Sequence, residues 1–147
     1  MSARTEIREV AGSWAGVSVQ PHRFGGLEYG LSGIELGHVH GDRLLDVPFT
    51  KKVRDLLITA GLAAEHHILK DSGWISFYLE TQEDTAHALW LLKMSYLYRA
   101  ATLIGKKNKD APLFLEAVQR EVETLNLPPD LADLFGKLLE RRRANVS

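Results

Sequence analysis

The feature that most constrains this chain is a run of short segments, between residues 17 and 49, in which apolar and polar residues alternate. A period of two is typical of a β-strand with one buried face. Turn signals separate the segments at Gly25-Gly26, Ser32-Gly33 and Gly41-Asp42. Strands with such short connections pair most directly with their neighbours, so the sequence predicts a four-stranded antiparallel meander.

A helix and a second pair of strands are predicted after the meander. Thr50 is expected to cap a helix over residues 50–60, and Gly61 to end it. Residues 64–69 and 74–79 have the pattern of two strands joined by a hairpin turn.

The longest predicted helix, over residues 83–104, is apolar nearly all round. A helix with one buried face needs a single apolar stripe, so we expect one face to meet the sheet and another to meet further helices, at 110–125 and 130–143, or a second subunit. The predicted fold class is α+β, with an antiparallel sheet (meander plus hairpin) packed on one face by helices and a C-terminal helical pair. We expect a core domain over 1–104 and a helical extension over 105–147 that packs on it.

Composition excludes several classes of protein. The 147 residues include no cysteine, which excludes a disulfide scaffold, a thiol nucleophile and thiolate zinc sites. The net charge of -1 argues against a nucleic-acid partner, despite basic runs at 106–109 and 141–143. Lys93 and Arg99 interrupt the most apolar stretch, 86–104, so no membrane span is expected. We expect a cytoplasmic protein and, from its apolar helices, a homodimer.

Between Trp14 and Arg99 the chain carries an ordered set of short motifs. They are Ser13–Val17, Pro21–Gly26, Glu35–Arg43, Asp46–Phe49, His66-His67, Asp71–Phe77 and Ala88–Leu92. Together these motifs resemble the luciferase domain family of small bacterial and fungal proteins. The order of elements is also similar to the MmcQ/YjbR-like fold, in which a C-terminal hairpin likewise leads into a helix. Neither resemblance implies an activity, and the sequence contains neither a Gly-rich dinucleotide fingerprint nor a P-loop.

Histidines form the sharpest candidate site. Alternate residues of a strand point the same way, so His38 and His40 should share one face, and His66 and His67 lie on another predicted strand. A carboxylate from Asp42, Asp46 or Asp71 is available to join them. Ile34 and Leu36 are expected on the same face as His38 and His40, which favours a structural role instead. A metal site, a polar pocket without metal and a structural role stay open, and no residue is assigned to a metal.

Other polar residues offer weaker signals. Ser72 could act as a nucleophile with His66 or His67 as its base, but no nucleophile-elbow motif surrounds it, and a turn explains the same residues. Arg23 and Arg43 are candidate anion clamps.

The sequence therefore predicts a module that binds a small molecule or another protein through a polar His/Asp pocket. The candidate ligand-binding residues are His38, His40, Arg43, His66, His67, Asp71 and Trp74. The alternative is a small enzyme, hydrolytic or metal-assisted, that uses the same cluster. The discriminating observation is whether these residues converge in one concave pocket.

Overall fold

A computed structural model describes residues 1–104 and 108–146. The chain forms two compact units, Met1–Ser95 and Tyr96–Ser147. The elements are α1 (Ala3–Ala11), β1 (Val17–His22), the 3-10 turn η1 (Arg23–Gly25), β2 (Gly26–Leu31), β3 (Ile34–His40), β4 (Leu44–Pro48), α2 (Lys51–Thr59), β5 (Ala64–Glu65), β6 (Trp74–Tyr78), α3 (Asp84–Leu103), α4 (Ala111–Thr124) and α5 (Pro129–Val146).

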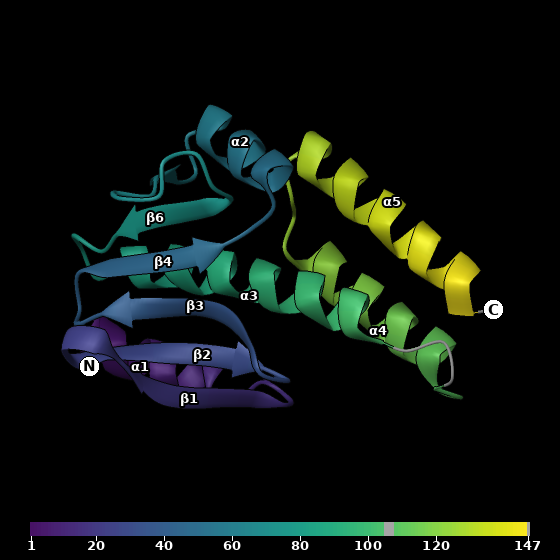
Figure 1. Ribbon diagram of the computed structural model, residues 1–147, viewed down its shortest axis with the longest axis horizontal. Helices are drawn as coiled ribbons and strands as arrows, with labels where there is room; N and C mark the ends of the chain where they lie inside the picture. The colour runs from purple at the N-terminus through teal and green to yellow at the C-terminus, as the bar shows by residue number, and fades with distance from the viewer. Residues whose placement is uncertain (105–107, 147) are drawn as a thin grey trace. The chain divides into compact units, whose positions relative to one another are not determined.

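The first unit is built on a six-stranded antiparallel sheet in the order β1-β2-β3-β4-β6-β5 (Figure 1). The predicted meander of β1 to β4 and the α+β fold class are confirmed. The second strand pair extends the sheet beyond β4, with β6 beside β4 and β5 at the edge. Consequently β3, β4 and β6 lie side by side at the centre of the sheet.

Strand β3 contains a β-bulge. Tyr29 of β2 pairs with Gly37 of β3, whereas the next residue, Gly30, pairs with Glu35. Leu36 is therefore an extra residue on β3, and such a residue locally breaks the alternation of side chains.

The bulge corrects one prediction from the sequence. Strict alternation would place Ile34 and Leu36 on the face of His38 and His40. The extra residue shifts the alternation, so the residues before it point to the faces opposite to those that the sequence predicts. Glu35 instead shares this face, since its Oε2 lies 2.6 Å from His38 Nδ1. Leu36 is fully buried. Ile34 and Leu36 favoured a purely structural role for the histidines, but they do not share the face of His38 and His40.

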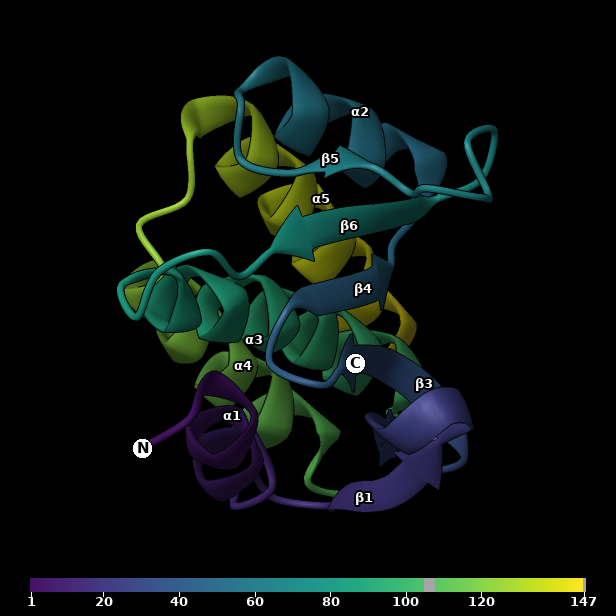
Figure 2. The ribbon, with the colours of Figure 1, turned by 90° about the vertical axis from the view of Figure 1, so that its left-hand side faces the viewer.

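Helix α1 and the first half of α3 cover one face of this sheet (Figures 1 and 2). Ser95 Oγ on α3 donates a 2.8 Å hydrogen bond to the Leu36 carbonyl oxygen. A Cβ atom at Gly37 would lie 2.9 Å from Leu92 Cδ1, so the absence of a side chain lets helix and sheet approach closely. The face opposite α3 is the one that carries His38 and His40.

The strand predicted over 64–69 is wrong beyond its first two residues, because β5 ends at Glu65. The backbone N–H groups of Ile68 and Leu69 donate to the side chain of His66, at 3.1 and 3.0 Å from its Nδ1. A side chain that accepts from nearby amides competes with strand pairing. The chain therefore turns at His66 instead of continuing along β6.

The second unit consists of the end of α3 together with α4 and α5, and it contains the predicted C-terminal helical pair. The rings of Tyr98 on α3 and Phe135 on α5 meet edge to face, with 6.0 Å between centroids. Arg142 on α5 donates a 3.0 Å hydrogen bond to the Ala101 carbonyl oxygen. The division of the chain after residue 104 and the packing of the extension on the core stay predictions.

Residues 105–107 of the predicted basic linker lie outside the described residues. Across residues 1–104 and 108–146, no helix combines the length and apolarity needed to cross a membrane.

Candidate functional site

The buried carboxylate of Asp46 is the centre of the candidate site. Asp46 lies on β4 between Leu45 and Val47, and all three residues have no exposed surface. Val47 lies on the face of α3, because its Cγ2 would be 3.4 Å from a Cβ at Gly37, beside Leu92. Since neighbouring residues of a strand point to opposite faces, Asp46 points away from α3.

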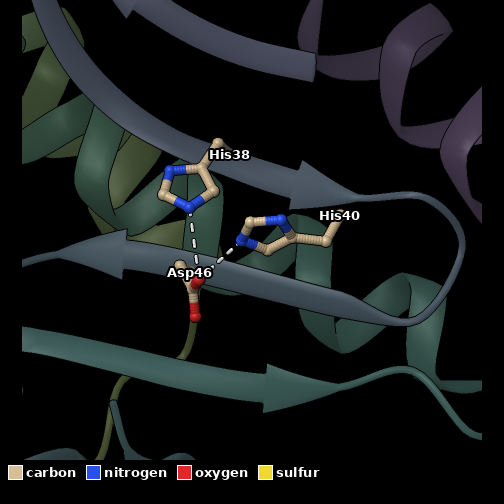
Figure 3. Close-up of side chains that lie close together, drawn as sticks. All are labelled: His38, His40 and Asp46. Atoms are coloured by element: carbon tan, nitrogen blue, oxygen red, sulfur yellow. Dashed lines mark hydrogen bonds and ion pairs between the residues drawn. The ribbon is translucent and has the colours of Figure 1, made fainter. Parts of the chain in front are cut away.

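Two imidazoles from β3 converge on one oxygen of this carboxylate. His38 Nε2 lies 3.2 Å and His40 Nε2 lies 3.0 Å from Asp46 Oδ2 (Figure 3). The pairing of β3 with β4 places His38 directly opposite Asp46. On the other side of β4, Ser76 of β6 donates a 2.6 Å hydrogen bond to Asp46 Oδ1.

His38 lies between two carboxylates. Its Nδ1 is 2.6 Å from Glu35 Oε2, and the bulge in β3 makes this contact possible. Burial by itself lowers the pKa of His38, but the hydrogen bonds and charges of Asp46 and Glu35 outweigh this effect and raise the pKa to about 9. These contacts therefore favour the protonated form of the imidazole in the protein without a bound ion.

The same contacts keep Asp46 ionised. Burial alone would raise the pKa of its carboxyl group. The hydrogen bonds with His38 and Ser76, and the charges of His66 and His38, outweigh burial and lower the pKa to about 2.

The turn after β5 brings two more histidines to the same carboxylate. His66 Nε2 lies 3.4 Å from Asp46 Oδ2, and His67 Nδ1 lies 3.9 Å from Asp46 Oδ1. Burial lowers the pKa of His66. Because two backbone amides donate to its Nδ1, the neutral ring carries its hydrogen on Nε2, facing Asp46.

A cavity of about 380 Å³ opens over this cluster. It is lined by His22, Arg23, His38, His40, Asp46, His66, His67, Ile68, Leu69 and Trp74. The His22 ring stacks on His38 at 4.0 Å, and the Trp74 ring lies 5.5 Å from His38. Ile68 and Leu69 are 73% and 47% exposed, and they add an apolar rim. A second cavity, of about 390 Å³, lies along α4 and α5, and its lining contains no histidine.

The structure brings five of the predicted site residues to one cavity, namely His38, His40, His66, His67 and Trp74. Arg43 and Asp71 are exposed and are not part of its lining. A ligand-binding role for all seven residues stays a prediction.

Ser72 has a structural role, as the turn interpretation predicts. Its hydroxyl donates to the Leu69 carbonyl oxygen at 2.6 Å and accepts from the Trp74 N–H at 3.1 Å.

Sequence reasoning missed two partners of His38, Glu35 and His22. A bulge in β3 positions Glu35, and strand pairing brings His22 across from β1. The sequence left open which of three carboxylates, Asp42, Asp46 or Asp71, would join the histidines. The alternation of Asp46 with two buried apolar neighbours is the signal that could have selected it.

Two groups of side chains in the cavity have the spacing to hold a metal ion. One is His38, His40 and Asp46, and the other is Asp46, His66 and His67; in each group the ligand atoms lie within 4.8 Å of one another.

The segment that contains most of this cluster is similar to a known family. Residues 33–95 match the family model of the Luciferase domain. The chain is similar to the Luciferase domain family over this segment. Its matched segment includes β3, β4, β6 and the start of α3, and with them Asp46 and four of the five cavity histidines. His22 and the predicted N-terminal motifs precede it. No curated protein and no solved structure matches the chain.

Proposed function

We propose that the protein is a binding module for a small polar ligand, which enters the cavity over Asp46. One observation carries this proposal: five histidines from two strands and a turn, together with Trp74, line a single cavity of about 380 Å³ around a buried carboxylate. Ligand sites in proteins are concave and combine apolar walls with a few convergent polar groups.

The lining indicates the chemistry of the ligand. The guanidinium of Arg23 supplies donors and positive charge, which suit oxygen acceptors. Trp74, Ile68 and Leu69 supply apolar surface in the same lining. A small molecule with one oxygen-rich end and one planar or apolar end fits both parts.

A small enzyme that uses the same cluster is the second candidate. The observation that favours it is the position of His38 between Glu35 and Asp46, where the imidazole can accept or release a proton at the cavity wall. A hydrolytic mechanism through Ser72 is less well supported, because both hydrogen bonds of its hydroxyl are made within the turn.

Native mass spectrometry of freshly purified protein tests the binding proposal. We expect a bound small molecule that is retained by the wild type and by His87→Ala, but lost from His67→Ala. His67 is partly exposed at the cavity, whereas His87 lies outside it and contacts the Leu62 carbonyl oxygen. If no mass is retained, and no compound in a library of small polar metabolites raises the melting temperature more in wild type than in His67→Ala, the proposal is wrong. Conversion of the bound compound would favour the enzyme.

Self-association and location complete the proposal. Leu103, Leu113 and Phe114 are 40%, 67% and 39% exposed, which supports a homodimer through the C-terminal helices. A monomeric mass across the micromolar range would refute the dimer. A cytoplasmic location and the similarity to the MmcQ/YjbR-like fold also stay predictions.

A further inference from the structure

We infer that His38, His40 and Asp46 form a binding site for a divalent transition-metal ion at the base of the cavity. The inference rests on the proposed function, since the metal would occupy the same cavity and a small ligand would complete its coordination. It names three protein ligands, His38 Nε2, His40 Nε2 and Asp46 Oδ2.

The spacing of these atoms suits a shared metal ion. Nitrogen and oxygen ligands lie about 2.0–2.2 Å from such an ion, so neighbouring ligands are about 2.9–3.4 Å apart at right or tetrahedral angles. His38 Nε2 and His40 Nε2 lie 3.2 and 3.0 Å from Asp46 Oδ2. Both imidazoles approach the same carboxylate oxygen from β3 (Figure 3).

The second nitrogen of His38 has the partner that a metal-bound histidine requires. A ligating histidine usually donates its other ring N–H to a carboxylate or carbonyl, which fixes the ring and leaves a lone pair for the metal. His38 Nδ1 lies 2.6 Å from Glu35 Oε2. The bulge in β3 therefore places a carboxylate behind the imidazole, on the side away from Asp46.

Asp46 is held in a similar way. Ser76 donates to Oδ1 at 2.6 Å, which fixes the carboxylate, and Oδ2 keeps a lone pair for the metal beside the one that faces His66 Nε2. The carboxylate comes from a central strand and is completely buried. A ligand held this firmly needs little reorganisation when an ion binds.

The other group of potential ligands is less suitable. His66 Nδ1 accepts from two backbone amides, at 3.1 and 3.0 Å, so the neutral ring carries its hydrogen on Nε2. That nitrogen has no lone pair to offer a metal. We therefore assign His66 to donate a hydrogen bond to Asp46, and we leave His67 as a cavity residue.

Three protein ligands leave coordination positions open toward the cavity. Two histidines and one carboxylate are typical of open zinc sites and of mononuclear iron sites, whereas structural zinc sites are closed by four protein ligands. The ligand atoms are imidazole nitrogens and a carboxylate oxygen, which favour Zn²⁺, Co²⁺, Ni²⁺ or Fe²⁺ over Mg²⁺ or Ca²⁺.

Titration of the chelator-treated, full-length protein with Co²⁺ tests the inference. We expect visible d–d absorption that saturates at one equivalent and that Zn²⁺ abolishes by competition. Absence of saturable absorption, together with no zinc binding by calorimetry, would overturn the metal site. If a small molecule is still retained in a manner that depends on His67, the binding module stands without the metal.

Variants identify the ligands. Glu35→Gln should weaken the affinity for Co²⁺ about 10–100-fold, as removal of an orienting partner usually does. His40→Ala should weaken it further, and melting curves will show whether this variant folds. His67→Ala and His87→Ala should bind Co²⁺ like the wild type. Loss of binding in His67→Ala, or full binding in both Glu35→Gln and His40→Ala, would refute the assignment.

Discussion

Replacing Asp46 with asparagine removes the charge around which the imidazoles gather, while it nearly preserves the shape of the side chain. The environment of Asp46 lowers the pKa of its carboxyl group from 3.8 to about 2. One pKa unit corresponds to about 1.4 kcal/mol, so the folded chain favours the carboxylate by about 2 kcal/mol. Because Asp46 has no exposed surface, solvent screening reduces this value little. We expect Asp46→Asn to lower the free energy of unfolding by about 2 kcal/mol at neutral pH.

The assay is urea unfolding of chelator-treated protein, followed by circular dichroism. Asp71→Asn is the matched control, because Asp71 is exposed and lies outside the cavity lining; it should unfold within about 0.5 kcal/mol of the wild type. The contribution of Asp46 should persist above pH 3.8 and disappear as the pH falls through 2, the direction expected for a lowered carboxyl pKa. An Asp46→Asn protein as stable as the wild type would refute the electrostatic reasoning.

Three further predictions concern the frame of the site. Tyr29 is fully buried, its hydroxyl has no hydrogen-bond partner among the described residues, and burial raises its pKa from 10.0 to about 12. The contribution of Tyr29 to the free energy of unfolding should therefore be intact below pH 10 and fall by up to about 3 kcal/mol as the pH rises through 12. Melting curves of Tyr29→Phe should lack this part of the alkaline loss of stability. An equal alkaline loss in the wild type and in Tyr29→Phe would contradict the reasoning. Gly37→Ala should cost about 1–3 kcal/mol in urea unfolding, because its Cβ would lie 2.9 Å from Leu92 Cδ1 and 3.0 Å from the Asp46 carbonyl oxygen; an unchanged midpoint would show that the bulge can relax. Gly73→Ala should destabilise the protein more than Gly37→Ala, since a Cβ there would lie 1.8 Å from the backbone oxygen of Phe49. A smaller loss of the free energy of unfolding than in Gly37→Ala, measured by urea unfolding, would contradict this prediction.

Local signals in the sequence were enough to predict most of the elements. Thr50 accepts from the Val53 N–H at 3.2 Å, and Gly61 ends α2 with a positive φ of 73°, as their residue types predict. Period-two alternation likewise located β1 to β4. Each of these features depends on a few neighbouring residues, which sequence patterns describe well.

The errors arose where side-chain hydrogen bonds or contacts between elements, and not the alternation of apolar residues, decide the local structure. The bulge depends on how β2, β3 and α3 pack at Gly37, and it moves Glu35 to the face of His38. The early end of β5 depends on the side chain of His66, which accepts two backbone amides. Neither effect follows from the alternation of apolar residues.

The candidate site could be predicted in part for the same reason. The spacing of His38 and His40 placed both on one face, because they follow the bulge and lie within one regular stretch. The choice of Asp46 over Asp42 and Asp71 depends on the register of β4 between β3 and β6. Sequence patterns carry little information about register across three strands.

The most direct test of the metal site is a crystal structure of the zinc-soaked protein, with anomalous diffraction recorded on both sides of the zinc absorption edge. We predict one anomalous peak within about 2.0–2.2 Å of His38 Nε2, His40 Nε2 and Asp46 Oδ2. The peak should have an open side toward the cavity, with Glu35 still bonded to His38 Nδ1. A peak between His66 and His67, or no peak in the cavity at saturating zinc, would contradict the account.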